Sequence, residues 1–355
     1  MTPRGTGRIG PDRSLSFTTG DVTVHGSLRA PVDPSHPVPA AVLVAGSGPV
    51  DRDGNATIGP YAGIALDCLR WLADVLADAG VASLRYDKLG VGATGPATFG
   101  SSELAGRSFQ DSGVQPARDA LACLADQPGI DPARLLVVGH SEGGGIALAV
   151  GGDAGDAPLP AGLALIEPMY ERALDTLARQ LVDQLRSSDL DRRTGEALVA
   201  WIDAGVRDIR DGSPPFPDPG PPPVPDARGF AATAQDVIAE AVYVRFRNLL
   251  GKTEDEIDPA ALAATIEVPV LLTAGAKDFN TPVDEDGRGV GVLARAFPPG
   301  IAELVVVEDL HHSLRDIGDA DQMTSDADAT AYPFSTQLAG ALDAFVARFT
   351  DDATP

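Results

Sequence analysis

Short, uninterrupted apolar runs recur along the chain, and stretches with helical periodicity separate them. The clearest runs are Ala40–Ala45, Leu135–Val138, Gly162–Ile166 and Val268–Ala274. A strand with one solvated face alternates apolar and polar residues, whereas a parallel strand covered on both faces is apolar throughout. Such strands alternating with helices predict an α/β fold with a mostly parallel central sheet flanked by helices.

The same patterns predict the remaining elements of this fold. Turn residues precede Val22–Val24 and Gly26–Leu28, which predicts that the two segments form an opening antiparallel hairpin. Further strands are expected at Val81–Tyr86 and Ala302–Val307. Amphipathic periodicity predicts helices over Ile64–Ala79, Val114–Ala125, Val290–Ala296 and Gln337–Phe349.

Between Met169 and Ile266 helical periodicity continues, but no strand-like run appears. Proline dominates residues 213–226, which must therefore be extended and cannot be helical. We predict a helical cap at residues 168–266 over the carboxyl edge of the sheet, with a separate helical domain as the alternative. Residues 15–167 and 267–350 then form the two parts of the core, and residues 1–14 form a disordered leader.

The charge of the chain limits its partners. Its 355 residues carry a formal net charge of −24, and nucleic acid and anionic membranes both need a cationic surface, so neither is an expected partner. No apolar run approaches the roughly 18 residues of a membrane span, and Met1–Arg13 lacks the apolar core of a secretory signal. We expect a cytoplasmic monomer or homodimer. The two cysteines, Cys68 and Cys123, predict neither a disulfide framework nor a metal site, and no cofactor is expected.

The turn Gly139-His140-Ser141-Glu142-Gly143 follows a buried strand and precedes a helix-compatible run. A sharp strand-to-helix turn strains the serine backbone and crowds the residues two positions away, where only glycine fits. The serine then lies at a helix amino terminus, whose N–H groups favour an oxyanion. We predict that Ser141 is a nucleophile; the alternative is a glycine-rich turn without chemistry.

A nucleophilic serine needs a base, and the base needs an acid that orients it. Asp278 and the pair His311 and His312 each follow a predicted strand, in the chain order serine, acid, histidine that this turn type requires. All therefore fall at the edge of the sheet that carries Ser141. Glu167, at the end of the strand before the insert, is the rival acid, and Asp278 could instead be an ordinary loop carboxylate.

An oxyanion hole needs two backbone donors. Glu142 N–H directly follows the nucleophile, and Ser47 N–H lies in Gly46-Ser47-Gly48 after the first parallel strand. We predict these two groups as the donors, with a plain glycine-rich turn as the alternative at Ser47. The Glu142 side chain, by contrast, is expected to be solvated or to attract an amine.

Four segments together resemble the signatures of a bacterial esterase branch of the α/β-hydrolase superfamily, related to serine aminopeptidase-like hydrolases. They are Gly46–Asn55, Arg85–Gly92, Gly139–Gly144 and His311–Arg315. The resemblance implies an α/β-hydrolase fold and the catalytic role for His312, with His311 in place of an asparagine. That second imidazole could tune the base or point away. Leu89 stands where this branch usually has an arginine.

The hypothesis is a serine hydrolase that cleaves carboxylic esters of small to medium, largely apolar substrates through an acyl-enzyme. Thioesterase, peptidase, and natural-product tailoring hydrolase or cyclase activities on the same residues are alternatives, as is a catalytically silent binding protein. Asp51, Arg52, Asp53 and Lys88 are expected to form a structural ion-pair network. Candidate residues for an apolar acyl pocket, which could equally hold cap helices together, are Met169, Tyr170, Trp201, Phe230 and Phe246.

Overall fold

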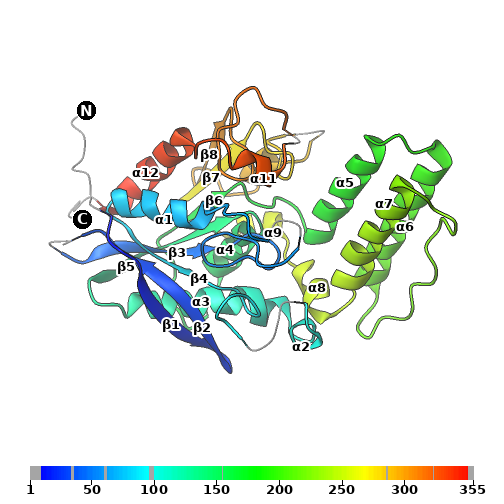
Figure 1. The fold of residues 1–355 in the computed structure, drawn as a ribbon. Helices are drawn as coiled ribbons and strands as arrows, with labels where there is room; N and C mark the ends of the chain where they lie inside the picture. Colours follow the sequence, from blue (N-terminus) through cyan, green and yellow to red (C-terminus); the bar gives the residue numbers. More distant parts are fainter. Residues whose placement is uncertain are drawn as a thin grey trace. The chain divides into compact units, whose positions relative to one another are not determined.

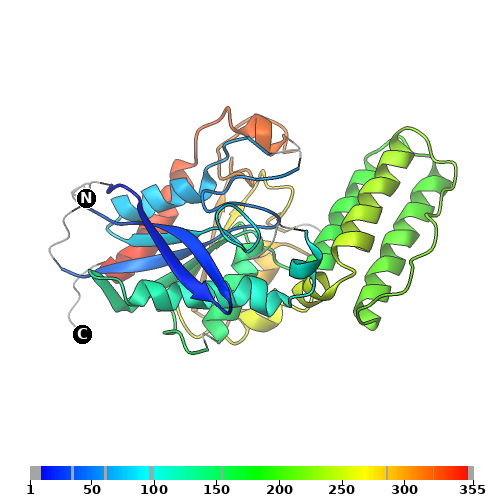
Figure 2. The same ribbon diagram turned by 60° about the horizontal axis from the view of Figure 1, so that its bottom comes forward.

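The computed structural model describes residues 9–32, 36–59, 62–95, 100–153, 155–284, 287–322 and 324–350. The chain forms two compact units, which are treated separately below (Figures 1 and 2). The sheet unit comprises Met1–Phe99, Gly113–Tyr170 and Pro259–Pro355, and the helical unit comprises Gly100–Ser112 and Glu171–Asp258.

An eight-stranded sheet in the order β1-β2-β4-β3-β5-β6-β7-β8 forms the sheet unit. The β1–β2 and β2–β4 pairs are antiparallel, and all later pairs are parallel. The predicted mostly parallel sheet is thus confirmed. The strands are β1 (Arg13–Thr19), β2 (Val22–Arg29), β3 (Val38–Val44), β4 (Ala82–Tyr86), β5 (Ile130–His140), β6 (Gly162–Ile166), β7 (Val270–Gly275) and β8 (Ala302–Val307).

Helices cover both faces of this sheet (Figure 1). On one face, α1 and α12 pack against side chains of the central strands, such as Leu43 and Leu136. In α1 the buried residues Leu69, Leu72 and Leu76 follow the helical spacing that the sequence shows, so one stripe of the helix enters the core. The helices of this unit are α1 (Cys68–Asp78), α3 (Gln115–Ala125), α4 (Glu142–Gly152), α9 (Pro259–Ala263), α10 (Val290–Ala294), α11 (Asp326–Ala329) and α12 (Thr336–Thr350).

The amino-terminal region differs from the prediction in two respects. Val22–Leu28 lies within the single strand β2, whose hairpin partner is β1, so the predicted hairpin within this segment is wrong (Figure 2). Residues 1–8 of the predicted leader lie outside the described residues, but Ile9 bridges Pro31 and Arg13 begins β1. The leader prediction is therefore wrong for residues 9–14, because they pair with β2 and with the two residues that follow it.

The helical unit contains α2 (Ser102–Ala105), α5 (Ala173–Arg186), α6 (Arg192–Asp211), α7 (Phe230–Ile238), the π-helical segment η2 (Ala239–Arg245) and α8 (Leu249–Glu254). A further π-helical segment, η1 (Gln110–Val114), leads from this unit into α3. Asp255, which is almost fully buried, accepts hydrogen bonds from Arg172, Arg210 and the N–H of Leu174. Residues 213–226, all of them described, contain neither helix nor strand.

The compact helical unit and the predicted insert have different boundaries. Residues 259–266 group with the sheet unit, where α9 packs against α4. Residues 100–112, predicted as part of the core, group with the helical unit, where the Phe109 N–H donates to the Thr253 hydroxyl.

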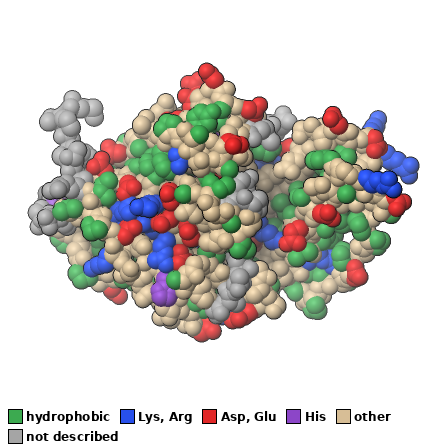
Figure 3. Space-filling model, viewed as in Figure 1, with side chains coloured by type: hydrophobic (Ala, Val, Ile, Leu, Met, Phe, Trp, Pro, Cys, Tyr) green, Lys and Arg blue, Asp and Glu red, His purple; other side chains and the backbone are tan. Residues whose placement is uncertain are grey.

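The described helices include none long and apolar enough to cross a membrane. Acidic side chains are spread over the face in view in Figure 3, whereas basic side chains form a few small groups.

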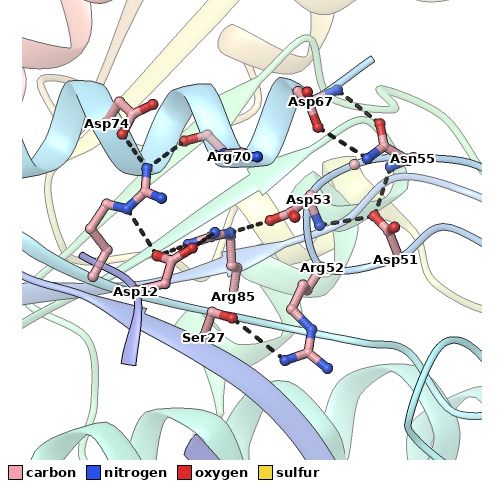
Figure 4. Close-up of polar contacts among 12 residues, drawn as sticks. Asp12, Ser27, Asp51, Arg52, Asp53, Asn55, Asp67, Arg70, Asp74 and Arg85 are labelled. Carbon is pink, nitrogen blue, oxygen red and sulfur yellow. Dashed lines mark hydrogen bonds and ion pairs between the residues drawn. The ribbon is translucent and has the colours of Figure 1, made fainter. Parts of the chain in front are cut away.

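A network of ion pairs connects the amino-terminal segment to β4 and to the loop after β3 (Figure 4). Arg85 of β4, which is 1% exposed, pairs with Asp12 and with Asp53. Asp12 also accepts a hydrogen bond from Arg29 at 2.9 Å. Burial opposes the charge of Asp12, but its hydrogen bonds from Arg85 and Arg29 outweigh this effect and lower the pKa of the carboxyl. Asp12 thus compensates two arginines that would otherwise be buried with fewer partners.

We expect the substitution Asp12→Asn to lower the free energy of unfolding by about 0.5–1.5 kcal/mol, because it removes one partner of a buried cation while solvent screens the charge of Asp12, which is itself exposed. Urea denaturation at neutral pH measures this change. The ionised carboxyl stabilises the fold above its unfolded-state pKa, and this contribution is lost as the pH falls through the lowered folded-state pKa. The difference from the wild type must therefore shrink in acid. The exposed Asp78 provides the control, since Asp78→Asn should change stability by less than about 0.5 kcal/mol; equal effects of the two variants would contradict the prediction.

Candidate active site

Ser141 occupies a sharp turn between β5 and α4. Its φ of 55° is rare for a residue with a side chain and indicates backbone strain. A Cβ atom on Gly139 would lie 2.0 Å from the Gly143 carbonyl oxygen, and one on Gly143 would lie 2.3 Å from the Val44 carbonyl oxygen. Only glycine fits at either position, which is the physical basis of the spacing seen in the sequence.

Three side chains from the ends of different strands form a hydrogen-bonded series at this turn. His312 Nε2 lies 3.1 Å from Ser141 Oγ, and His312 Nδ1 lies 2.7 Å from Asp278 Oδ2. The Nδ1–H donates to the carboxylate, which leaves Nε2 to accept the serine proton. The structure therefore brings together the predicted serine, acid and histidine. Ser141 and Asp278 are more than 130 residues apart in the sequence.

Asp278 is held as an acceptor by its own loop. The N–H groups of Asn280 and Thr281 donate to Oδ1, and the Thr281 hydroxyl donates to Oδ2 at 2.6 Å. Burial favours the neutral acid, but the charge and hydrogen bond of His312, together with hydrogen bonds from the Glu167 and Thr281 side chains, outweigh burial and lower the pKa of Asp278. Burial likewise opposes the charged form of His312, but Asp278 outweighs it and raises the pKa of the imidazole.

Glu167, the rival acid, lies beside Asp278 and does not receive the hydrogen bond of His312 Nδ1. It follows β6, is fully buried, and accepts the Gly275 N–H at 2.8 Å and the Thr273 hydroxyl at 3.2 Å. The Nδ1 hydrogen bond of His312 goes to Asp278. Burial and the nearby Asp278 charge raise the pKa of Glu167 well above its ordinary value. Glu167 is thus a neutral acid that can hydrogen-bond to the Asp278 carboxylate.

His140 is a site residue that the sequence reasoning missed. Its Nε2–H donates to the backbone carbonyl of His312 at 3.0 Å, and the two rings lie 4.9 Å apart between centroids. Burial, followed by the proximity of His312, lowers the pKa of His140 to about 3, so this ring stays neutral. Its place in the turn was visible in the sequence, but its partner lies 172 residues away, and local sequence patterns do not reveal such a contact.

The second histidine of the pair is oriented away from Ser141. His311 Nδ1 accepts from the Ser313 hydroxyl, and Nε2–H donates to the Thr324 carbonyl, both at 2.9 Å. Both ring nitrogens are therefore engaged by other residues. Leu89, which replaces the arginine usual in the resembled branch, is a buried apolar side chain.

The two predicted oxyanion donors belong to segments that follow neighbouring strands, β3 and β5. A Cβ on Gly46 would lie 3.2 Å from Ser141 Cβ, so the Gly46–Ser47 backbone passes close to Ser141. The expectation of a solvated Glu142 side chain is wrong: Glu142 is buried and pairs with Lys88 at 2.8 Å. The expected network around Lys88 also differs, since Arg52 pairs instead with Asp87.

The candidate pocket residues are divided between the two units. In the sheet unit, Tyr170 is buried, and the N–H of the half-buried Met169 donates to the Ser141 carbonyl at 3.1 Å. In the helical unit, Trp201 stacks on Tyr243, and Phe246 is buried. Phe230 is 52% exposed. Trp201 and Phe246 thus make packing contacts within their own unit. The described residues contain no cluster of histidine, cysteine and acidic side chains arranged to hold a metal ion.

Comparisons with known proteins identify the fold. A family model described as alpha/beta hydrolase fold matches residues 110–205, and no curated protein matches the chain. An esterase from Pyrococcus furiosus is similar at 14% identity and TM-score 0.55, covering 96% of this chain and 92% of that one. Est1E from Butyrivibrio proteoclasticus, solved with ferulic acid bound, has 13% identity, TM-score 0.51, and coverage of 94% and 98%. The acylaminoacyl peptidase of Pyrococcus horikoshii has 13% identity and TM-score 0.53, covering 97% of this chain but 42% of the peptidase.

We expect the free energy of unfolding of Glu167→Gln to increase relative to that of the wild type as the pH rises from about 4.5 to 6. Unfolded glutamate ionises near pH 4.3, whereas folded Glu167 keeps its proton. The free energy of unfolding of the wild type therefore falls by up to about 1.4 kcal/mol per pH unit, and an amide at this position does not cause this fall. Urea denaturation across this range measures the difference. Glu308→Gln, at an exposed position of the same unit, should show no such trend. Parallel pH curves for wild type and Glu167→Gln would refute the neutral acid.

Proposed function

Because the chain has the α/β-hydrolase fold, we propose that it is a serine hydrolase that cleaves carboxylic esters through an acyl-enzyme. The observation that carries this proposal is the hydrogen-bonded series from Ser141 through His312 to Asp278, at the strained turn before α4. A serine hydroxyl alone is a weak nucleophile, and a histidine placed to take its proton activates it.

The proposed first half-reaction forms the bond between Ser141 Oγ and the ester carbonyl carbon. His312 Nε2 takes the hydroxyl proton as that bond forms, and the carbonyl π electrons move onto oxygen. The charge of Asp278 stabilises the resulting imidazolium. Collapse of the tetrahedral intermediate breaks the bond to the alkoxide, which leaves as the alcohol with the proton from His312. Water then repeats these steps on the acyl-enzyme and releases the acid and free Ser141.

The developing negative charge is proposed to be held by the N–H groups of Ser47 and Glu142. Fixed donors aimed at an oxyanion supply several kcal/mol of transition-state stabilisation, because they need no reorientation during the reaction. The amino terminus of α4 adds the partial positive charge of a helix that is 11 residues long.

An ester fits this site better than a substrate with a free amine. The Glu142 carboxylate, which could have attracted an ammonium group, is buried and already neutralised by Lys88. The net charge of −24 disfavours anionic substrates, which leaves small to medium neutral esters as the proposed class. We further propose that the helical unit acts as a cap that selects the substrate, and that Met169 and Tyr170 contact the acyl group.

We expect Ser141→Ala to abolish labelling by a fluorophosphonate and to reduce turnover of a short nitrophenyl ester by at least about 10³-fold, because it removes the nucleophile. Peptide mass spectrometry of the labelled wild type should locate the probe on Ser141. Ser16→Ala, on the exposed side of edge strand β1, should behave as wild type. Folded wild-type protein that takes up no label would instead indicate a binding role. Parallel assays with a thioester and an aminoacyl anilide distinguish the other hydrolase classes.

Ester turnover should rise with pH to a plateau, because only neutral His312 can accept the serine proton. Since Asp278 raises the pKa of His312, the midpoint in kcat/KM should lie above the ordinary value of about 6.5. Asp278→Asn should move that midpoint to lower pH and reduce kcat by about 10²–10⁴-fold. Asp78→Asn serves as the control with an unchanged profile. A midpoint that stays in place in Asp278→Asn would show that Asp278 does not act on His312.

A further inference from the structure

Lys88 reaches across the carboxyl edge of the sheet. It follows β4 by two residues, and β3 lies between β4 and β5 in the sheet. Its Nζ donates to the Gly46 carbonyl after β3 and to the Glu142 carboxylate at the start of α4, the latter at 2.8 Å. One ammonium group thus contacts the peptide group that contains the Ser47 N–H and the side chain of Glu142, the two residues proposed to supply the oxyanion donors.

The first contact acts on the peptide that contains the Ser47 N–H. The Gly46 carbonyl and the Ser47 N–H are two ends of one planar trans peptide group, so they point in opposite directions. A donor that fixes the carbonyl therefore also fixes the direction of the N–H. A charged donor on the carbonyl further polarises the amide, which strengthens the hydrogen bond that its N–H can donate.

The second contact anchors Lys88 itself. Glu142 is 7% exposed, and burying a carboxylate without a partner would be costly, so the ion pair stabilises both side chains. It also connects the loop after β3 to the first residue of α4. The two donors are thereby held in one arrangement relative to Ser141, rather than depending on two independent loops.

We propose that Lys88 is a positioning residue of the oxyanion hole, which orients and polarises the Gly46–Ser47 peptide while holding it to Glu142. The inference rests on the proposed ester hydrolysis. Lys88 itself does not touch the reacting atoms; it acts through the backbone.

The kinetic test compares Lys88→Met with a matched loss of a cation elsewhere. We expect Lys88→Met to lower kcat for a nitrophenyl ester by about 10–100-fold with KM changed less than about threefold, because only the charged transition state uses the donors. The control is Arg134→Met: Arg134 also donates to two backbone carbonyls, of Pro37 and Phe349, but from the amino-terminal half of β5. It should leave kcat unchanged. Lys88→Arg keeps a cation and should recover part of kcat, and it replaces Lys88→Met if that variant does not fold.

The spectroscopic test observes the peptide directly and does not require turnover. Labelling glycine at the carbonyl carbon and serine at nitrogen selects the four Gly–Ser peptides of the chain, which begin at Gly26, Gly46, Gly100 and Gly212. In Lys88→Met the Gly46 carbonyl signal should move upfield with the loss of its hydrogen bond, while the other three stay in place. A Ser47→Thr variant assigns the signal by removing it.

The outcomes separate this inference from the proposed function. A shifted Gly46 signal together with a lowered kcat supports the role of Lys88. An unmoved Gly46 signal overturns it, as does an unchanged kcat in Lys88→Met when Ser141→Ala is inactive. If wild type neither turns over esters nor labels at Ser141, ester hydrolysis fails, and the Gly46 signal still decides whether Lys88 fixes this peptide.

Discussion

The close packing of three backbone segments at the nucleophile turn is the constraint on which the site depends. Gly139 and Gly143 bring the end of β5 against the start of α4, and Gly143 also packs against the Val44 carbonyl at the end of β3. Any side chain at either glycine would force these segments apart. The register of the parallel pair, with Val44 opposite Gly139, places the two strand ends level. This register brings Ser141 close to Gly46 in the loop after β3.

Buried charge at the site is balanced by neutral neighbours as well as by ion pairs. Asp278 remains ionised because His312 and three local donors stabilise it, whereas the adjacent Glu167 keeps its proton. Two buried carboxylates in contact would repel each other strongly, so ionising one requires the other to stay neutral. His140 follows the same logic, since its neutral ring beside His312 adds no positive charge to oppose the imidazolium. The four neighbouring titratable groups thus differ in how readily they take up a proton: burial and their neighbours lower the pKa of Asp278 and His140 and raise the pKa of Glu167 and His312.

The sequence was sufficient to predict features that depend on local pattern. Continuous apolar runs predicted the parallel strands, and residues after those strands predicted that Ser141, Asp278 and His312 would be close, since the carboxyl ends of parallel strands share one edge. Their roles remain proposals. Side-chain partners distant in sequence could not be predicted: Glu142 looked solvated because Lys88 is 54 positions away, and Asp12 looked disordered because Arg85 is 73 positions away. The β1–β2 hairpin was misplaced because Gly26, within β2, resembles a turn residue.

The use of cations in the sheet unit follows from their scarcity. The chain has 27 lysines and arginines against 51 acidic residues, so even one-to-one pairing would leave 24 acidic side chains without a cation, and these must stay hydrated. The buried or half-buried cations Arg29, Arg85 and Lys88 each bind groups from two other segments. Of these contacts, the Lys88–Glu142 pair is shielded from solvent at both ends, and salt weakens such a pair much less than it weakens exposed pairs. Added salt would therefore reduce the repulsion between surface carboxylates while leaving this connection beside Ser141 largely intact.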